Sequence, residues 1–104
     1  HDDIGTFAKC FDTHHVDTWV IRAVYEELQA WIPSPTFPIT ADDDIRKTLE
    51  IDEDDLREDI VERIAQRTGR DSDWLPSNPL NGQVHTARDL VMFFNAQPRR
   101  ETLN

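Results

Sequence analysis

The apolar residues of this chain fall into three blocks with helical spacing, and they nowhere alternate for long enough to build a sheet. In residues 16–32 they recur at steps of three and four, which predicts an amphipathic helix with a broad apolar face. That predicted face consists of Val16, Trp19, Val20, Ala23, Val24, Leu28 and Trp31. Residues 54–69 and 86–96 carry shorter stripes of the same kind. We expect Trp19, Trp31, Phe93 and Phe94 to lie in the core. The pattern predicts an all-α bundle of three main helices.

Local motifs mark where the second and third of these helices begin and end. Asp52 and Asp54 are both candidate N-caps of the second helix, and Gly69 is suited to end it. Thr86 opens the third helix with a capping box whose acidic partner is Asp89. Both helices are therefore expected to begin at defined residues.

The segments between the helices are predicted to be loops. Three prolines within residues 33–38 end the first helix. Residues 39–55 then form an acidic loop that isolated apolar side chains are expected to anchor on the core. These side chains are Ile39, Ile45, Leu49 and Ile51. Residues 70–85 form a second loop, in which Trp74 either plugs the bundle or makes an exposed contact.

The chain of 104 residues has the length of one small domain. We divide it into an N-terminal arm (1–15), a helical domain (16–96) and a polar tail (97–104). A single cysteine, Cys10, cannot form an internal disulfide, which favours a reducing compartment. No apolar run approaches the roughly 20 residues of a membrane span, and no signal peptide is apparent. We expect a cytoplasmic monomer without a membrane partner.

The charge of the chain restricts its partners. It has 21 acidic and 11 basic residues, which gives a formal net charge of −10. A domain this acidic is repelled by phosphate, so we expect no nucleic-acid partner. A basic protein surface is the natural complement.

Residues 39–54, ITADDDIRKTLEIDED, align without a gap with the loop motif I-T-P-D-x-S-F-x-x-D-L-G-x-D-S-L of acyl carrier proteins. The matching or equivalent positions are Ile39, Thr40, Asp42, Ile45, Leu49, Ile51 and Asp52. The sequence TARDLV at 86–91 is similar to the start of the last helix in that family. The chain thus resembles the acyl carrier protein family over roughly residues 16–96. This resemblance implies a carrier-like helical bundle, here with an N-terminal extension.

The chain departs from that family at the serine that carries phosphopantetheine. Glu53 occupies its position, and a register shifted by two residues places Asp55 there instead. A carboxylate cannot serve as the hydroxyl nucleophile of the attachment reaction, so we expect no cofactor. The chain resembles a divergent, serine-less branch of bacterial carrier-like proteins.

Acidic residues are concentrated between Asp42 and Glu62, where 11 acids accompany three bases. They can form a solvated face with helix-capping acids, or a surface that recognises a partner. In carrier proteins the acidic second helix docks on basic patches of partner enzymes. The resemblance therefore implies a partner-binding surface made of Asp52, Glu53, Asp54, Asp55, Glu58, Asp59 and Glu62.

We expect neither catalysis nor a dedicated metal site. No nucleophile–base pair is apparent, and an EF-hand frame starting at Asp42 has Lys47 where glycine is required. The leading hypothesis is a non-enzymatic interaction module. One alternative is a working carrier modified at an unrecognised serine such as Ser72, and another is an acidic inhibitor or immunity-type protein.

Overall fold

The computed structural model describes residues 3–32 and 39–99, and these residues form helices, turns and loops without a strand. The elements are α1 (Asp3–Ala8), α2 (Thr18–Trp31), α3 (Glu53–Asp55), η1 (Leu56–Ile60), α4 (Val61–Thr68) and α5 (Ala87–Ala96). Extended pairing in the described part is limited to two isolated bridges, Asp44 with Thr86 and Arg70 with Arg99. The predicted all-α class is confirmed. The three prolines predicted to end the first helix lie outside the described residues.

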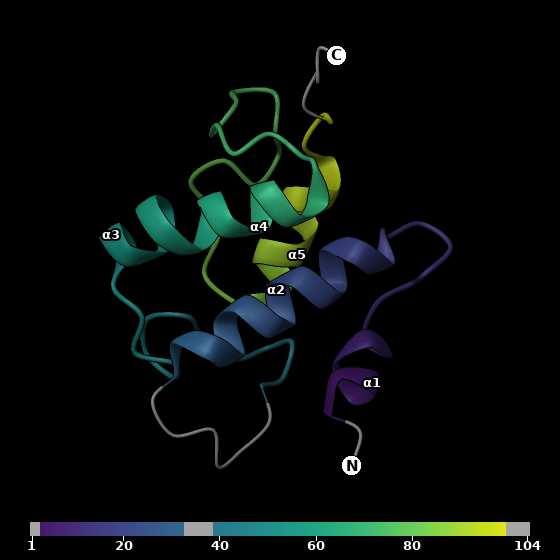
Figure 1. Cartoon of the computed structure of the whole chain (residues 1–104), viewed down its shortest axis with the longest axis vertical. Coiled ribbons are helices and arrows are strands. Elements are labelled where there is room, and N and C mark those ends of the chain that lie inside the picture. The colour runs from purple at the N-terminus through teal and green to yellow at the C-terminus, as the bar shows by residue number, and fades with distance from the viewer. Residues whose placement is uncertain (1–2, 33–38, 100–104) are drawn as a thin grey trace.

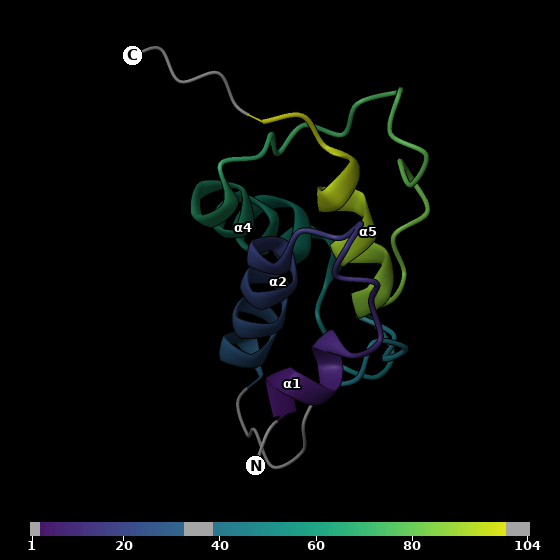
Figure 2. The ribbon, with the colours of Figure 1, turned by 90° about the vertical axis from the view of Figure 1, so that its right-hand side faces the viewer.

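Helix α2 is the central element of the bundle (Figure 1). It contacts α1, α4 and α5, and Figure 2 shows α4 and α5 on different sides of it, with α1 at one end. Three of these helices contribute fully buried side chains, among them Val20 on α2, Ile64 on α4 and Phe94 on α5. Burying a side chain of this size contributes roughly 1.5–3 kcal/mol, so this shared core holds the helices together.

The second predicted helix is a continuous helical segment made of α3, η1 and α4. Its N-cap is Asp52, whose carboxylate accepts the backbone N–H of Glu53 at 3.0 Å. In η1 the bonding widens to a π-helical pattern, because the Val61 N–H reaches the carbonyl of Leu56, five residues back. Gly69 ends the helix in the left-handed conformation, with φ of 72°. The predictions for Asp52 and Gly69 are confirmed.

The capping box predicted for the last helix is present. The hydroxyl of Thr86 accepts the backbone N–H of Asp89 at 3.1 Å, and the Asp89 carboxylate accepts the N–H of Thr86 at 3.1 Å. Phe93 and Phe94 on this helix are fully buried, as expected. The box fixes where α5 begins and so which side of it faces the core.

The expectation that Trp19 lies in the core is wrong, because its side chain is 66% exposed. The buried residues of α2 include Ile21 and Tyr25 as well as the predicted ones, which moves the centre of the buried face to about Val24. Trp19 lies five residues before Val24, so at about 3.6 residues per turn the two side chains point about 140° apart. Trp31 is partly buried against the core.

The loops are held to the core by the predicted apolar residues. Ile39, Ile45, Leu49 and Ile51 are all buried. The N-terminal arm also packs on the bundle, since Phe7 and Phe11 are buried and the Phe7 ring lies 5.2 Å from that of Tyr25. Trp74 is partly buried against the core, with its ring centroid 4.4 Å from that of Phe93.

Candidate functional site

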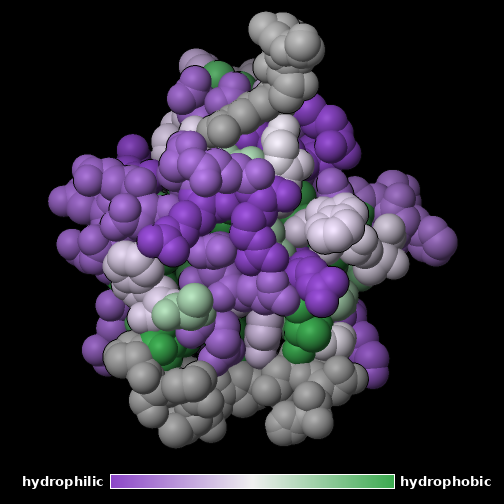
Figure 3. All heavy atoms as spheres, in the orientation of Figure 1, coloured by the Kyte–Doolittle hydropathy of each residue, from purple (hydrophilic) through white to green (hydrophobic). Residues whose placement is uncertain are grey.

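The seven acidic residues predicted to bind a partner lie along one helical segment, at its N-cap and over its first two and a half turns. We call them the acidic face: Asp52, Glu53, Asp54, Asp55, Glu58, Asp59 and Glu62. Asp55 and Glu62 are half-buried, and the other five are exposed. The opposite side of the segment is buried, with Leu56, Ile60 and Ile64 in the core. The surface over α3, η1 and α4 is mostly hydrophilic (Figure 3).

Four of the seven carboxylates of the acidic face have no counter-charge in the described part of the chain. Glu53 pairs with Arg57 at 3.1 Å, and Glu62 accepts a hydrogen bond from Gln66 at 3.3 Å. Apart from the N-cap Asp52, the remaining side chains form no ion pair or hydrogen bond with another described residue. They are Asp54, Asp55, Glu58 and Asp59. A carboxylate in this state is available to a lysine, arginine or N–H group of another molecule.

Acidic residues on α2 are compensated, in contrast. Arg67 donates to both Glu26 and Glu27, and Arg22 donates to Glu26 at 3.2 Å. The hydrogen bond from Arg67 lowers the pKa of Glu26, and the same bond raises the pKa of Arg67. These carboxylates link α2 to α4 and are already occupied.

The sequence alignment with the carrier motif predicts that Glu53 stands at the serine position. Glu53 is the first helical residue after the N-cap, and its side chain is occupied by Arg57. Ser72 is half-buried in the segment that follows Gly69, where only turns and bends occur before α5. It therefore does not lie at the start of a helix.

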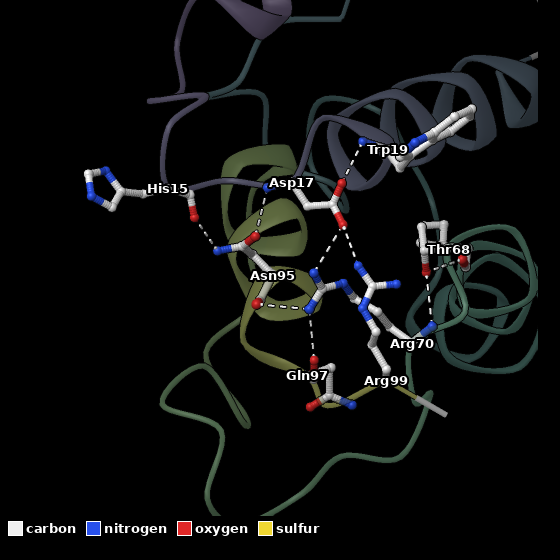
Figure 4. Close-up of polar contacts among 9 residues, drawn as sticks. His15, Asp17, Trp19, Thr68, Arg70, Asn95, Gln97 and Arg99 are labelled. Carbon is white, nitrogen blue, oxygen red and sulfur yellow. Dashed lines mark hydrogen bonds and ion pairs between the residues drawn. The ribbon is translucent and has the colours of Figure 1, made fainter. Parts of the chain in front are cut away.

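A second group of polar side chains, which we call the Asp17 cluster, joins the start of α2 to the end of α5 (Figure 4). It consists of Asp17, Arg70, Asn95, Gln97 and Arg99. Asp17 caps α2 and accepts Arg70 Nη2 at 3.0 Å, with Arg99 Nη2 at 3.7 Å. Arg70 Nη1 also donates to the backbone carbonyls of Asn95 at 3.2 Å and Gln97 at 2.9 Å.

The pair at the centre of the Asp17 cluster is largely buried. The side chains of Arg70 and Asp17 are 13% and 17% exposed. Burial acts to raise the pKa of Asp17, but the hydrogen bonds from Arg70 and from the Trp19 N–H outweigh it, so this pKa lies below its usual range. The amide of Asn95 accepts the Asp17 N–H at 2.9 Å and donates to the His15 carbonyl at 3.1 Å. Arg70 Nε is buried without a hydrogen-bond partner, but the other polar groups of the cluster satisfy one another, which indicates a structural role.

The polar contacts extend inward through Gln97, the first residue of the predicted tail, which is only 2% exposed. Its amide nitrogen donates to the carbonyls of Asp71 and Asp73, both at 2.7 Å. Its amide oxygen accepts Asn78 Nδ2 at 2.7 Å. The sequence did not predict the roles of these residues. Asparagine and glutamine in loop segments carry no local pattern that separates a buried residue from an exposed one.

Within the described residues no three His, Cys, Asp or Glu side chains are grouped so that they could hold a metal ion. Among the described helices, none has both the length and the apolar character required to cross a bilayer. Comparison of the chain with protein-family models, curated proteins and solved structures found no match. The function must therefore be inferred from the residues themselves.

Proposed function

We propose that this chain is a carrier-like interaction module without enzymatic activity, and that its acidic face docks on a basic surface of a protein partner. The proposal rests on the four uncompensated carboxylates Asp54, Asp55, Glu58 and Asp59. Lysine and arginine side chains of a partner would supply the missing counter-charges. Such complementarity mainly raises the association rate and selects the partner.

The fold gains little from these carboxylates. Acids in the first helical turn interact favourably with the helix dipole, which accounts for Asp54 and Asp55. Glu58 and Asp59 lie beyond that turn, four residues after Asp54 and Asp55 respectively. Like charges at this spacing destabilise a helix by roughly 0.2–0.5 kcal/mol per pair. A role outside the fold explains why the charges accumulate here.

The carrier-like part of the proposal is supported by the arrangement around Glu53. The preceding loop is anchored by Ile45 and Ile51, Asp52 caps the helix, and the residue after the cap occupies the aligned serine position. Because that residue is a carboxylate, we infer that no phosphopantetheine is attached and that no cofactor is required.

The test is capture of partner proteins by the immobilised chain, with two variants that remove three negative charges each. D54N/E58Q/D59N removes exposed acids of the acidic face. D12N/D42N/D73N removes three exposed acids elsewhere, of which Asp12 and Asp42 pair with His15 and Arg88, and serves as the control for net charge. We expect the wild-type chain and the control variant to capture a partner with a basic surface. We expect this capture to be lost with the acidic-face variant and at high salt.

Unchanged capture by D54N/E58Q/D59N would contradict the proposal. If the captured protein is a basic nuclease or another toxic enzyme that the chain blocks, the module is an inhibitor. A separate measurement tests the cofactor inference. Intact mass after incubation with coenzyme A and a phosphopantetheinyl transferase should show no adduct, whereas an adduct on Ser72 or another serine would make the chain a working carrier.

A further inference from the structure

A groove of about 460 Å³ lies beside the start of the second helical segment. Its walls come from the turn at 44–47, from Glu53, Leu56 and Arg57 on the helix, and from the loop that contains Trp74, Val84 and His85. We call it the Trp74 groove. Its volume is in the range of pockets that bind small organic molecules.

The apolar wall of the Trp74 groove is well fixed. The Trp74 ring packs on the buried Phe93 ring with a centroid distance of 4.4 Å, and Ile45 and Leu56 are themselves buried. The guanidinium of Arg57 lies 4.7 Å from the centroid of the Trp74 ring. A flat apolar molecule therefore contacts Trp74 at the edge of its ring, or on the face of the ring after displacing the Arg57 guanidinium.

The charged side chains of the groove are unusual for this acidic chain. Six of the ten described arginine and lysine residues form ion pairs, and the other four do not. Arg46 and Lys47 belong to the unpaired four and are adjacent, exposed and part of the groove. Lys9 and Arg63, the other two, lie outside it.

Neither acid that lines the groove forms an ion pair with Arg46 or Lys47, although Asp44 lies within electrostatic reach of Lys47. The Asp44 carboxylate accepts the backbone N–H groups of Arg46 at 2.9 Å and Lys47 at 2.8 Å, so it shapes the turn. The hydrogen bond from the Lys47 N–H is the main reason why the pKa of Asp44 is lowered. Glu53 is held by Arg57 at 3.1 Å. The side-chain charges of Arg46 and Lys47 remain available.

We propose that the Trp74 groove binds a small aromatic anion. Its ring lies against Trp74, and its negative group is attracted by Arg46 and Lys47. A cation would be repelled by these side chains, and a neutral ring would gain only the apolar contact. The groove shares Glu53 with the acidic face, but Asp54, Glu58 and Asp59 do not line it, so the two binding sites can be tested separately.

The experiment uses 2-naphthoate as the probe, with the neutral 2-naphthylmethanol and the cationic 2-naphthylmethylamine for comparison. Binding is followed by the NMR shifts of the indole N–H groups and of the backbone amides. We expect 2-naphthoate to shift Trp74 and residues 44–47 in a saturable way. Trp19, which lines a different groove between α1 and α2, is the internal control and should not move.

Charge variants test the polar part of the site. R46Q/K47Q should raise the Kd for 2-naphthoate roughly five-fold, because two exposed charge interactions are lost. K9Q/R63Q removes the two unpaired cations outside the groove, and it should leave the Kd unchanged. The D54N/E58Q/D59N variant should also bind 2-naphthoate normally, which separates this site from partner docking.

Three results would overturn the proposal. One is the absence of a selective shift at Trp74. Another is equal affinity for 2-naphthoate and 2-naphthylmethanol, which would make the groove merely apolar. The third is an equal loss of affinity for 2-naphthoate in R46Q/K47Q and K9Q/R63Q, which would mean that only the net charge of the chain matters.

Discussion

The Asp17 cluster and the acidic face use the same chemical group in opposite ways. Asp17 is 17% exposed, caps its own helix and is paired with Arg70. Glu58 and Asp59 on the acidic face are exposed and have no partner among the described residues. The first carboxylate holds three parts of the chain together. The other two make no ion pair or hydrogen bond within the described part of the fold.

Because of this difference, we expect the two groups of residues to have separate roles, one in stability and one in the proposed recognition. Removing one member of a buried pair leaves an uncompensated charge where water has little access, which is costly. Removing an exposed, unpaired carboxylate removes only weak long-range interactions. The Asp17 cluster should therefore determine how stable the chain is, and the acidic face what it binds.

The largest expected effect follows from Arg70→Met. Asp17 then loses its main counter-charge, and the Asn95 and Gln97 carbonyls lose a donor. We expect the free energy of unfolding to fall by about 3 kcal/mol, the lower end for a broken buried pair. Urea denaturation followed by circular dichroism measures this change.

The control for that variant is Arg22→Gln, which breaks an exposed pair with Glu26. This substitution should lower the free energy of unfolding by well under about 1 kcal/mol. Equal losses in the two variants would show that the Asp17 cluster is no more important to stability than a surface pair. Partner capture at temperatures where both are folded should stay at the wild-type level.

A smaller effect is expected from pH acting on Asp17. Its pKa is lowered in the folded chain, whereas an unfolded aspartate titrates near pH 3.9. The ionised form thus stabilises the fold above the unfolded pKa, and this stabilisation is lost as the pH falls through the folded pKa. Asp17→Asn keeps a capping side chain but has no charge to titrate.

The wild-type chain should consequently be more stable than Asp17→Asn at neutral pH, and the gap should narrow as the pH falls below about 4. Urea denaturation across this range gives the gap directly. A gap that stays constant with pH would mean that Asp17 acts only through its cap.

Local features of the fold could be predicted from the sequence, and contacts between distant segments could not. The N-cap Asp52, the C-terminal Gly69 and the Thr86 capping box depend on neighbouring residues and were correctly predicted. The exposure of Trp19 depends on how α2 is rotated by all its neighbours. The pairing of Asp17 with Arg70, 53 residues away, depends on the packing of whole helices.

The two candidate sites also differ in how far the sequence could predict them. The acidic face was predictable because its residues are close in sequence on one helix, so their spacing alone places them together. The Trp74 groove was not, because Lys47, Arg57 and Trp74 come from three separate segments. Which acids are left without a counter-charge also became clear only from the structure.

The smallest change in stability is expected for the acidic face. D54N/E58Q/D59N should change the free energy of unfolding by no more than about 0.5 kcal/mol, although it removes three charges. Lost dipole interactions near the start of the helix and relieved repulsion further along act in opposite directions. Urea denaturation of D54N/E58Q/D59N beside the wild-type chain measures the change. A loss above about 1 kcal/mol would mean that these carboxylates serve the fold, so that lost partner capture could be explained by unfolding.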